Sequence, residues 1–260
     1  MKNEKLLIKM SDLHKKKIRL DVLLLNRGLA PSRHRAQAII GAGKVFVNGK
    51  LCDKCGTKFS PDVSIELKEK DHPYVSRGGL KLEHALKEFN ITVDDLVCID
   101  VGASTGGFTD CLLRHGAKRV YAVDVGYGQL DISLRENDKV VVMERKNIRY
   151  ISPDEIPEPC DLATIDTSFI SLKLVIPSVI PLLKERGKII ALIKPQFEAG
   201  AKFLKKGVLR DENIRKKVVE DLCTFFTKEL GLICKGVSPS PILGPKGNKE
   251  FLCYLKLNNK

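Results

Sequence analysis

A glycine-rich segment between an apolar run and a helix-like stretch is where this sequence first suggests chemistry. It reads DVGASTGGFTD, from Asp100 to Asp110, and follows a strand-like run, which is where α/β sheets place nucleotide-binding loops. A dinucleotide-binding loop needs G-x-G-x-x-G, but Ser104 stands two residues after Gly102, and the segment lacks the Gly-Lys-Ser/Thr of a P-loop. NAD and ATP therefore lose support, whereas small residues still allow the close backbone approach that a methionine-bearing nucleoside requires. Asp124 ends the next strand-like run, 22 residues after Gly102, a position from which a carboxylate reaches ribose hydroxyls. A glycine loop alone is more often a tight turn, so the loop and the acid carry this prediction together.

Four charged residues are expected at the same edge of the sheet as this loop. Asp166 ends the apolar run LATID and Lys194 ends IIALIK, so both come at carboxyl ends of strands, where ligands bind in open α/β sheets. Glu250 begins a strand expected to run antiparallel to the others, which brings its start to that edge. Lys81 lies at the start of the helix-like segment GLKLEHALKEF, on a different side from the core-facing residues. A lysine that ends a buried strand can simply extend to solvent, so these residues indicate a site only as a group.

The elements that must position these residues alternate along the chain from residue 80 to residue 260. Strand-like runs include LVCIDVG, RVYAVDVG, VVVM, DLATID and KIIALIK, and helices are predicted at 106–115, near 172–183 and over 211–231. Such alternation predicts an α/β fold with a mostly parallel, Rossmann-like sheet. The last two strands, around LICKGVS and EFLCYLKL, would form an antiparallel hairpin.

The segment before residue 80 has a different pattern. Residues 18–67 read as a small α+β unit of two short helices and a few strands, with Ser32 as a helix N-cap and Asn48-Gly49 as a tight turn. Residues 68–79 read as a linker and 1–17 as a basic extension. The second helix carries Arg33 and Arg35 in its first turn, near Lys44, a pattern suited to RNA phosphates. A merely solvated basic face is an equally good interpretation of the charges alone.

Composition limits the function classes. The 260 residues include 45 Lys/Arg and 32 Asp/Glu, a net charge of +13, of which the first 75 residues carry +8, so a polyanionic partner is expected. The eight cysteines are scattered, and several, such as Cys98, Cys111 and Cys253, lie in apolar stretches typical of reduced core thiols. Cys52 and Cys55 form a CxxC pair without a second pair or a suitably spaced histidine, so no metal site is expected. Neither a signal peptide nor a membrane-spanning run is visible, which favours a cytoplasmic protein.

Several separated motifs resemble the TlyA family, whose members are known both as haemolysins and as rRNA 2'-O-methyltransferases. They are VSRGGLKLEHAL, DVGASTGGF, DVGYGQL, DTSFISL, IKPQFEAG and GNKEF, and the resemblance spans roughly residues 18–257. Residues 18–67 are similar to the RNA-binding module of ribosomal protein S4, and residues 80–260 to FtsJ-type ribose methyltransferases. The departures are Tyr74-Val75, where the family commonly has Trp-Val, and a chain that ends ten residues after Glu250, which favours large-subunit 23S rRNA over small-subunit 16S rRNA.

This resemblance implies methyl transfer from S-adenosylmethionine to a ribose 2'-hydroxyl, of a cytidine in rRNA, without a metal. The family's K-D-K-E tetrad falls on Lys81, Asp166, Lys194 and Glu250, with Lys194 as the general base. Asp124 would contact the cofactor's ribose and Asn147 its adenine. The methionine part would contact the loop residues Gly102, Ser104, Thr105, Gly106, Gly107 and Phe108. The expected RNA-binding residues are Arg19, Arg33, Arg35, Lys44 and Arg77.

Two other functions remain open from the sequence. One is a haemolysin or pore-forming protein, disfavoured because the alternation of elements is that of a packed soluble sheet. The other is a ribosome-assembly factor that binds RNA without catalysis, disfavoured because all four tetrad positions are intact. The methylated nucleotide, the form of the ribosomal substrate and the oligomeric state are left undetermined.

Overall fold

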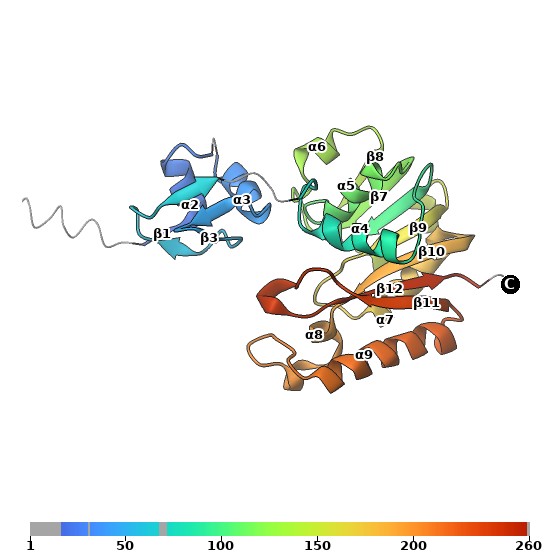
Figure 1. Ribbon diagram of the computed structural model, residues 1–260. Coiled ribbons are helices and arrows are strands. Elements are labelled where there is room, and N and C mark those ends of the chain that lie inside the picture. Colours follow the sequence, from blue (N-terminus) through green and yellow to red (C-terminus); the bar gives the residue numbers. More distant parts are fainter. Residues whose placement is uncertain (1–16, 31, 68–71, 259–260) are drawn as a thin grey trace, which may run out of the picture. The chain divides into compact units, whose positions relative to one another are not determined.

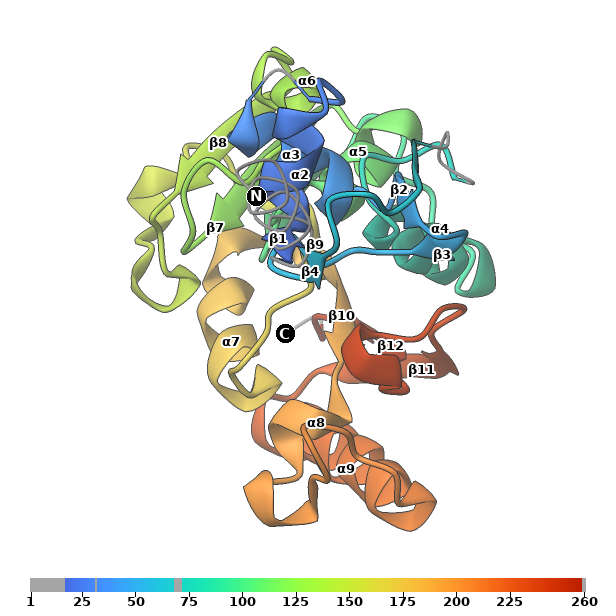
Figure 2. The same cartoon turned by 90° about the vertical axis from the view of Figure 1, so that its left-hand side faces the viewer.

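A computed structural model describes residues 17–30, 32–67 and 72–258 (Figures 1 and 2). The chain divides into two compact units, residues 1–77 and 78–260, which are described separately. The predicted extension 1–17 lies outside the described residues except for Lys17, as do residues 68–71 of the predicted linker. Helix α4 (Gly78–Glu88) begins within the segment predicted as linker.

In its described residues, the small unit has two helices and two small sheets. Strands β1 (Ile18–Arg19) and β4 (Lys58–Phe59) pair antiparallel, and a second sheet has the order β3-β2-β5. The bounds of the remaining elements are α2 (Leu20–Asn26), α3 (Arg33–Gly41), β2 (Val45–Val47), β3 (Lys50–Leu51) and β5 (Ile65–Leu67). Buried apolar residues of both helices and β2 form its core.

Local sequence signals explain the ends of these elements. The Ser32 hydroxyl accepts a hydrogen bond from the Arg35 amide at 3.1 Å and so caps α3, as predicted. Asn48 and Gly49 have φ values of 50° and 74° and join β2 to β3 in the predicted tight turn.

The large unit contains a seven-stranded sheet of order β11-β12-β10-β9-β6-β7-β8. Its parallel strands are β6 (Val97–Val101), β7 (Arg119–Asp124), β8 (Val140–Glu144), β9 (Cys160–Ile165) and β10 (Leu183–Ile193). Strand β12 (Phe251–Lys256) pairs antiparallel with both β10 and β11 (Ile233–Pro239). The predicted α/β class, with a mostly parallel sheet and an antiparallel last strand, is confirmed.

Helices cover both faces of this sheet (Figures 1 and 2). Helices α4 and α5 (Gly107–Arg114) pack together on one face, and α7 (Leu172–Val179) and α9 (Glu212–Thr224) contribute to the apolar core on the other. The two short helices are α6 (Ile132–Arg135) and α8 (Pro195–Glu198).

Two helices are shorter than the sequence pattern predicted. Helix α7, which already contains Pro177, gives way to a 3-10 turn over Ile180–Leu182 at Pro181, the second proline whose nitrogen has no hydrogen to donate to a helical hydrogen bond. Helix α9, capped by Asp211 as predicted, passes at Phe225 into a π-helical turn that runs to Glu229.

Candidate active site

The loop that follows β6 approaches the neighbouring strand very closely. Gly102 has a φ of 85°, and a Cβ atom placed there would lie 2.8 Å from the carbonyl oxygen of Asp166. Only glycine fits both the left-handed backbone and this contact. The end of β6 is thereby held against the residue that follows β9.

Asp124, the last residue of β7, holds the same loop from the other side. Its Oδ2 accepts a hydrogen bond from the Ser104 amide at 2.8 Å, and its Oδ1 accepts one from the Gly126 amide at 2.7 Å. A carboxylate oxygen can accept more than one hydrogen bond, so Asp124 can still receive a ligand hydroxyl.

A pocket of about 440 Å³ opens at this edge of the sheet, within the size range of small-molecule sites. Five of its lining residues were predicted as site residues: Gly102, Ser104, Asp124, Asn147 and Asp166. The Asn147 side chain also accepts a hydrogen bond from the Arg149 amide at 3.1 Å. The prediction missed further lining residues that directly follow the ends of β7, β8 and β9: Val125, Gln129, Lys146, Ile148, Thr167, Ser168, Phe169 and Ile170. Their place just after strand ends is the signal that could have found them.

The rest of the predicted cofactor loop lies outside the lining of this pocket. Gly106 takes a left-handed conformation before α5, where a Cβ atom would lie 2.2 Å from Leu134. Gly107 begins the helix and Phe108 is buried. These residues and Thr105 shape the turn from the loop into α5, and their contact with a cofactor stays a prediction.

The four predicted tetrad residues form two ion pairs. Lys81 Nζ lies 2.6 Å from Glu250 Oε2, and Lys194 Nζ lies 2.6 Å from Asp166 Oδ1. Both lysines are more than 90% buried, at 7% and 8% exposure, and Glu250 is 2% exposed. Buried charges are retained in pairs because an unpaired one is expensive to desolvate.

A second hollow, of about 410 Å³, adjoins the first and shares Ser168 and Phe169 with it. Lys194, Gln196 and Glu250 line this hollow, whereas Asp166 lines the first. The Lys194–Asp166 pair therefore spans two adjoining spaces, an arrangement suited to transferring a group from a ligand in one to a ligand in the other.

Two side chains that line these hollows each have a buried polar atom without a hydrogen-bond partner. Thr167 Oγ1 and Gln196 Oε1 are buried without a hydrogen-bond partner in the structure, which is uncommon because such groups are usually satisfied. Thr167 lines the first hollow and Gln196 the second. Each hollow therefore has one lining residue with an unsatisfied polar atom.

Asp100, which was not predicted as a site residue, anchors the start of the loop through hydrogen bonds to neighbouring elements. Its carboxyl is fully buried and accepts hydrogen bonds from Thr109 Oγ1 at 2.7 Å and Thr164 Oγ1 at 3.0 Å. Burial raises the pKa of Asp100 to about 7, opposed by these two hydrogen bonds. The residue thus ties β6 to α5 and β9 just before Gly102.

In the small unit, two of the predicted RNA-binding arginines are held by a buried acid. Asp21 accepts hydrogen bonds from Arg19 and from Arg33, each at 3.0 Å, and a further one from Gln37. The hydrogen bonds from Arg19 lower the pKa of Asp21. Arg19 and Arg33 remain about half exposed, with side chains at 41% and 53%, so Asp21 presents their guanidinium groups at the surface.

The other predicted RNA-binding residues are not gathered around Asp21. Arg35 is exposed and Lys44 is half-buried. Arg77 pairs loosely with Asp53, at 3.8 Å.

Within the described parts of both units, the helices are too short or too polar to cross a membrane.

Comparison with known proteins identifies both units. A family model described as FtsJ-like methyltransferase matches residues 74–257, and the S4 domain model matches residues 18–65. YqxC of Bacillus subtilis, described as a candidate rRNA methyltransferase, is 51% identical over 92% of this chain and 86% of its own length.

Two further relatives carry different descriptions. The 16S/23S rRNA (cytidine-2'-O)-methyltransferase TlyA of Mycobacterium tuberculosis is 42% identical over 93% of this chain and 90% of its own length. A solved structure from Streptococcus thermophilus, described as a candidate hemolysin, has a TM-score of 0.74 and 45% identity, covering 94% of this chain and 90% of its own.

Proposed function

The chain belongs to the FtsJ-like methyltransferase family, as its motifs predicted, and we propose that it is an rRNA 2'-O-ribose methyltransferase dependent on S-adenosylmethionine. The observation that carries this function is the buried Lys194–Asp166 pair at the boundary of two adjoining hollows. One hollow suits a methyl donor, and the other suits a nucleotide of the acceptor RNA.

The 440 Å³ pocket fits S-adenosylmethionine in size and in its polar groups. Gly102 lets the backbone approach the ligand closely, Asp124 can accept from the ribose hydroxyls, and the Thr167 hydroxyl lacks a partner. Asn147 also lines the pocket, and we propose that it contacts the adenine. When bound, this cofactor supplies an electrophilic methyl group on a positively charged sulfur.

Lys194 is proposed as the general base. In its neutral form, Nζ would accept the proton of the ribose 2'-hydroxyl as that oxygen takes the methyl group, and the bond from the methyl carbon to the sulfonium sulfur would break to leave a neutral thioether. In the structure, Nζ lies 2.6 Å from Asp166 Oδ1 and donates to Ser168 Oγ at 2.8 Å, and both partners would stabilise the ammonium group once the proton is taken up. These two partners fix where Nζ lies, and correct placement of the reacting atoms supplies much of the rate.

Lys81 and Glu250 are proposed to position the acceptor. Their ion pair is buried, and Glu250 also accepts from Gln196 Nε2 at 3.4 Å. Because Glu250 and Gln196 both line the second hollow, a ribose there would meet a fixed set of hydrogen-bonding groups.

The proposed partner is ribosomal RNA, with the S4 unit supplying affinity. Relatives named for rRNA methylation and the basic small unit with its exposed arginines support this partner. A cytidine target is proposed because a relative is named for it, and both 16S and 23S rRNA are proposed as sources because that relative is named for both. An rRNA substrate also implies a cytoplasmic location.

The direct test mixes purified protein, methyl-labelled S-adenosylmethionine and unmodified ribosomal subunits, followed by nuclease digestion and mass spectrometry. We expect 2'-O-methylcytidine in rRNA, and none when the RNA carries 2'-deoxycytidine at the target. Label on a base, or no label on either subunit or on free rRNA, would contradict the proposal.

A haemolysin is the second candidate, since a related structure carries that description. It predicts dye release from protein-free liposomes at protein concentrations that support methyl transfer. Release that persists in a methyl-transfer-deficient variant would assign a separate membrane activity to the chain.

A further inference from the structure

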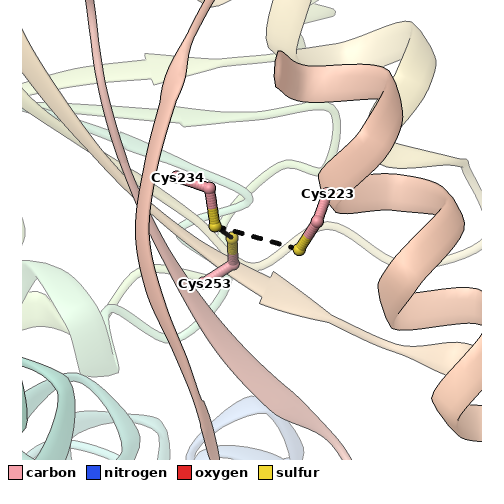
Figure 3. Close-up of side chains that lie close together, drawn as sticks. All are labelled: Cys223, Cys234 and Cys253. Atoms are coloured by element: carbon pink, nitrogen blue, oxygen red, sulfur yellow. Dashed lines mark hydrogen bonds between the residues drawn. The ribbon is translucent and has the colours of Figure 1, made fainter. Parts of the chain in front are cut away.

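Three cysteine side chains from different elements meet on one face of the large unit's sheet (Figure 3). Cys223 lies in the last turn of α9, Cys234 near the start of β11, and Cys253 in β12. The Cys234 sulfur lies 3.9 Å from that of Cys223 and 4.0 Å from that of Cys253, and all three sulfurs lie within 4.8 Å of one another.

We propose that Cys223, Cys234 and Cys253 form a binding site for a soft, thiophilic metal ion of the Zn²⁺ or Cu⁺ class. Metal–sulfur bonds of about 2.3 Å place the sulfurs of a three-thiolate site about 3.8–4.0 Å apart, for tetrahedral to trigonal angles. Two of the three separations already have these values, and the third needs to shrink by less than about 1 Å. Almost no rearrangement of the chain is required.

The backbone explains why the sulfurs converge. Cys234 pairs with Leu255, and Cys253 pairs with Val237, so the two cysteines are diagonal neighbours across β11 and β12. A bulge between Cys234 and Gly236 shifts the register between them, and bulges re-aim side chains. Helix α9 places Cys223 over the same face, as Figure 3 shows.

The chemistry of the donor set selects the ion. Within the described residues, no carboxylate or imidazole joins this group, and thiolates prefer Zn²⁺ and Cu⁺ to Mg²⁺ or Ca²⁺. Cu⁺ is satisfied by three sulfurs, whereas Zn²⁺ takes a fourth ligand. Cys223 and Cys234 are only half-buried, which leaves access for the ion and for a water molecule.

Metal binding would deprotonate these thiols, because the thiolate is the form that binds metal. A bound ion would join α9 to β11 and β12. Cys253 lies three residues after Glu250, so the ion would also stabilise the strand that follows this proposed site residue.

A metal site at these three cysteines differs from the expectation of no metal, which rested on the Cys52–Cys55 pair. That pair provides the matched control, because CxxC is itself a common zinc motif. The variants are Cys223→Ser and Cys234→Ser, both half-buried and therefore tolerant of the change, and the double control Cys52→Ser/Cys55→Ser. All are prepared fully reduced, without oxygen and free of metal.

Zn²⁺ and Cu⁺ are titrated separately against a competing chromophoric chelator, and bound metal is counted by elemental analysis. We expect one ion per chain in the wild type and in the double control. In either cluster variant, the affinity for the ion should be at least about 100-fold weaker. Metal should also raise the thermal unfolding midpoint of the wild type and leave that of Cys223→Ser unchanged. Cobalt substitution should give a sulfur-to-metal charge-transfer band. Circular dichroism and cofactor binding confirm that the variants are folded.

Four results would overturn the proposal. Three of them are the absence of tight binding of either ion to the reduced wild type, equal binding by the cluster variants, and loss of binding in the Cys52/Cys55 control. A mass 2 Da below that of the fully reduced chain, mapped to Cys223 and Cys234, would show a disulfide instead of a metal site and would also refute it.

Discussion

Replacing Gly102 by alanine is expected to weaken both folding and cofactor binding. A residue with a Cβ atom costs about 1–2 kcal/mol in a left-handed conformation, and Gly102 has a φ of 85°. The new Cβ would also lie 2.8 Å from the Asp166 carbonyl oxygen, and such overpacking costs about 1–3 kcal/mol. The free energy of unfolding should therefore fall by about 2–5 kcal/mol.

Gly231→Ala is the matched control for the cost of placing a residue with a Cβ atom in a left-handed backbone conformation. Gly231 has a φ of 65° and no atom within 4 Å of the added Cβ, so only the conformational cost of about 1–2 kcal/mol applies. Urea unfolding of both variants and the wild type measures the difference, which isolates the clash with Asp166.

The clash in Gly102→Ala should also weaken cofactor binding. Relieving it moves the loop or the residue that follows β9, both of which line the 440 Å³ pocket. Affinity for S-adenosylmethionine, measured by calorimetry, should fall at least about tenfold in Gly102→Ala, corresponding to about 1.4 kcal/mol, and stay unchanged in Gly231→Ala. Equal stability losses in the two variants, with cofactor affinity retained in both, would refute the reasoning.

Two further sets of variants test the buried ionisable side chains. Burial raises the Asp100 pKa to about 7 from 3.8, so the folded chain keeps this carboxyl neutral while the unfolded chain ionises. Between pH 4 and 7 the wild type should lose about 4 kcal/mol of stability relative to Asp100→Asn, with no further change above pH 7; a pH-independent difference in urea unfolding would contradict this. Glu250→Ala leaves the Lys81 ammonium buried without its partner and should lower the free energy of unfolding by about 3–5 kcal/mol. The double variant Lys81→Met/Glu250→Ala should recover part of that loss, and failure to recover any would argue against an unpaired charge as the cause.

The layout of the site could be predicted because strand ends obey a simple rule. Asp124, Asp166 and Lys194 each end an apolar run, and parallel strands bring such residues to one edge. Glu250 joins them because β12 is antiparallel, as the hairpin signal indicated. The sequence could not tell which lysine pairs with which acid, since that depends on side-chain geometry across four elements.

Other parts of the structure depend on contacts that sequence spacing does not encode. After Ser104 the chain turns into α5 and carries Phe108 into the core, which the spacing of the loop residues did not indicate; their contact with the cofactor stays a prediction. Asp21 and Asp100 are buried acids held by partners distant in the sequence. Cys253 was correctly predicted to be buried, yet its grouping with two other cysteines needs the bulge in β11.

The most direct test of the proposed reaction is the rate of 2'-O-methylation of rRNA by Lys194→Ala. Lys184→Ala is the matched control, because Lys184 lies at the other end of β10 and pairs with Asp161 at 2.7 Å, much as Lys194 pairs with Asp166. With cofactor binding verified in both, the account predicts that Lys194→Ala slows methyl transfer about 10²–10⁴-fold and that Lys184→Ala does not. A wild-type rate in Lys194→Ala would contradict the assignment of Lys194 as the general base.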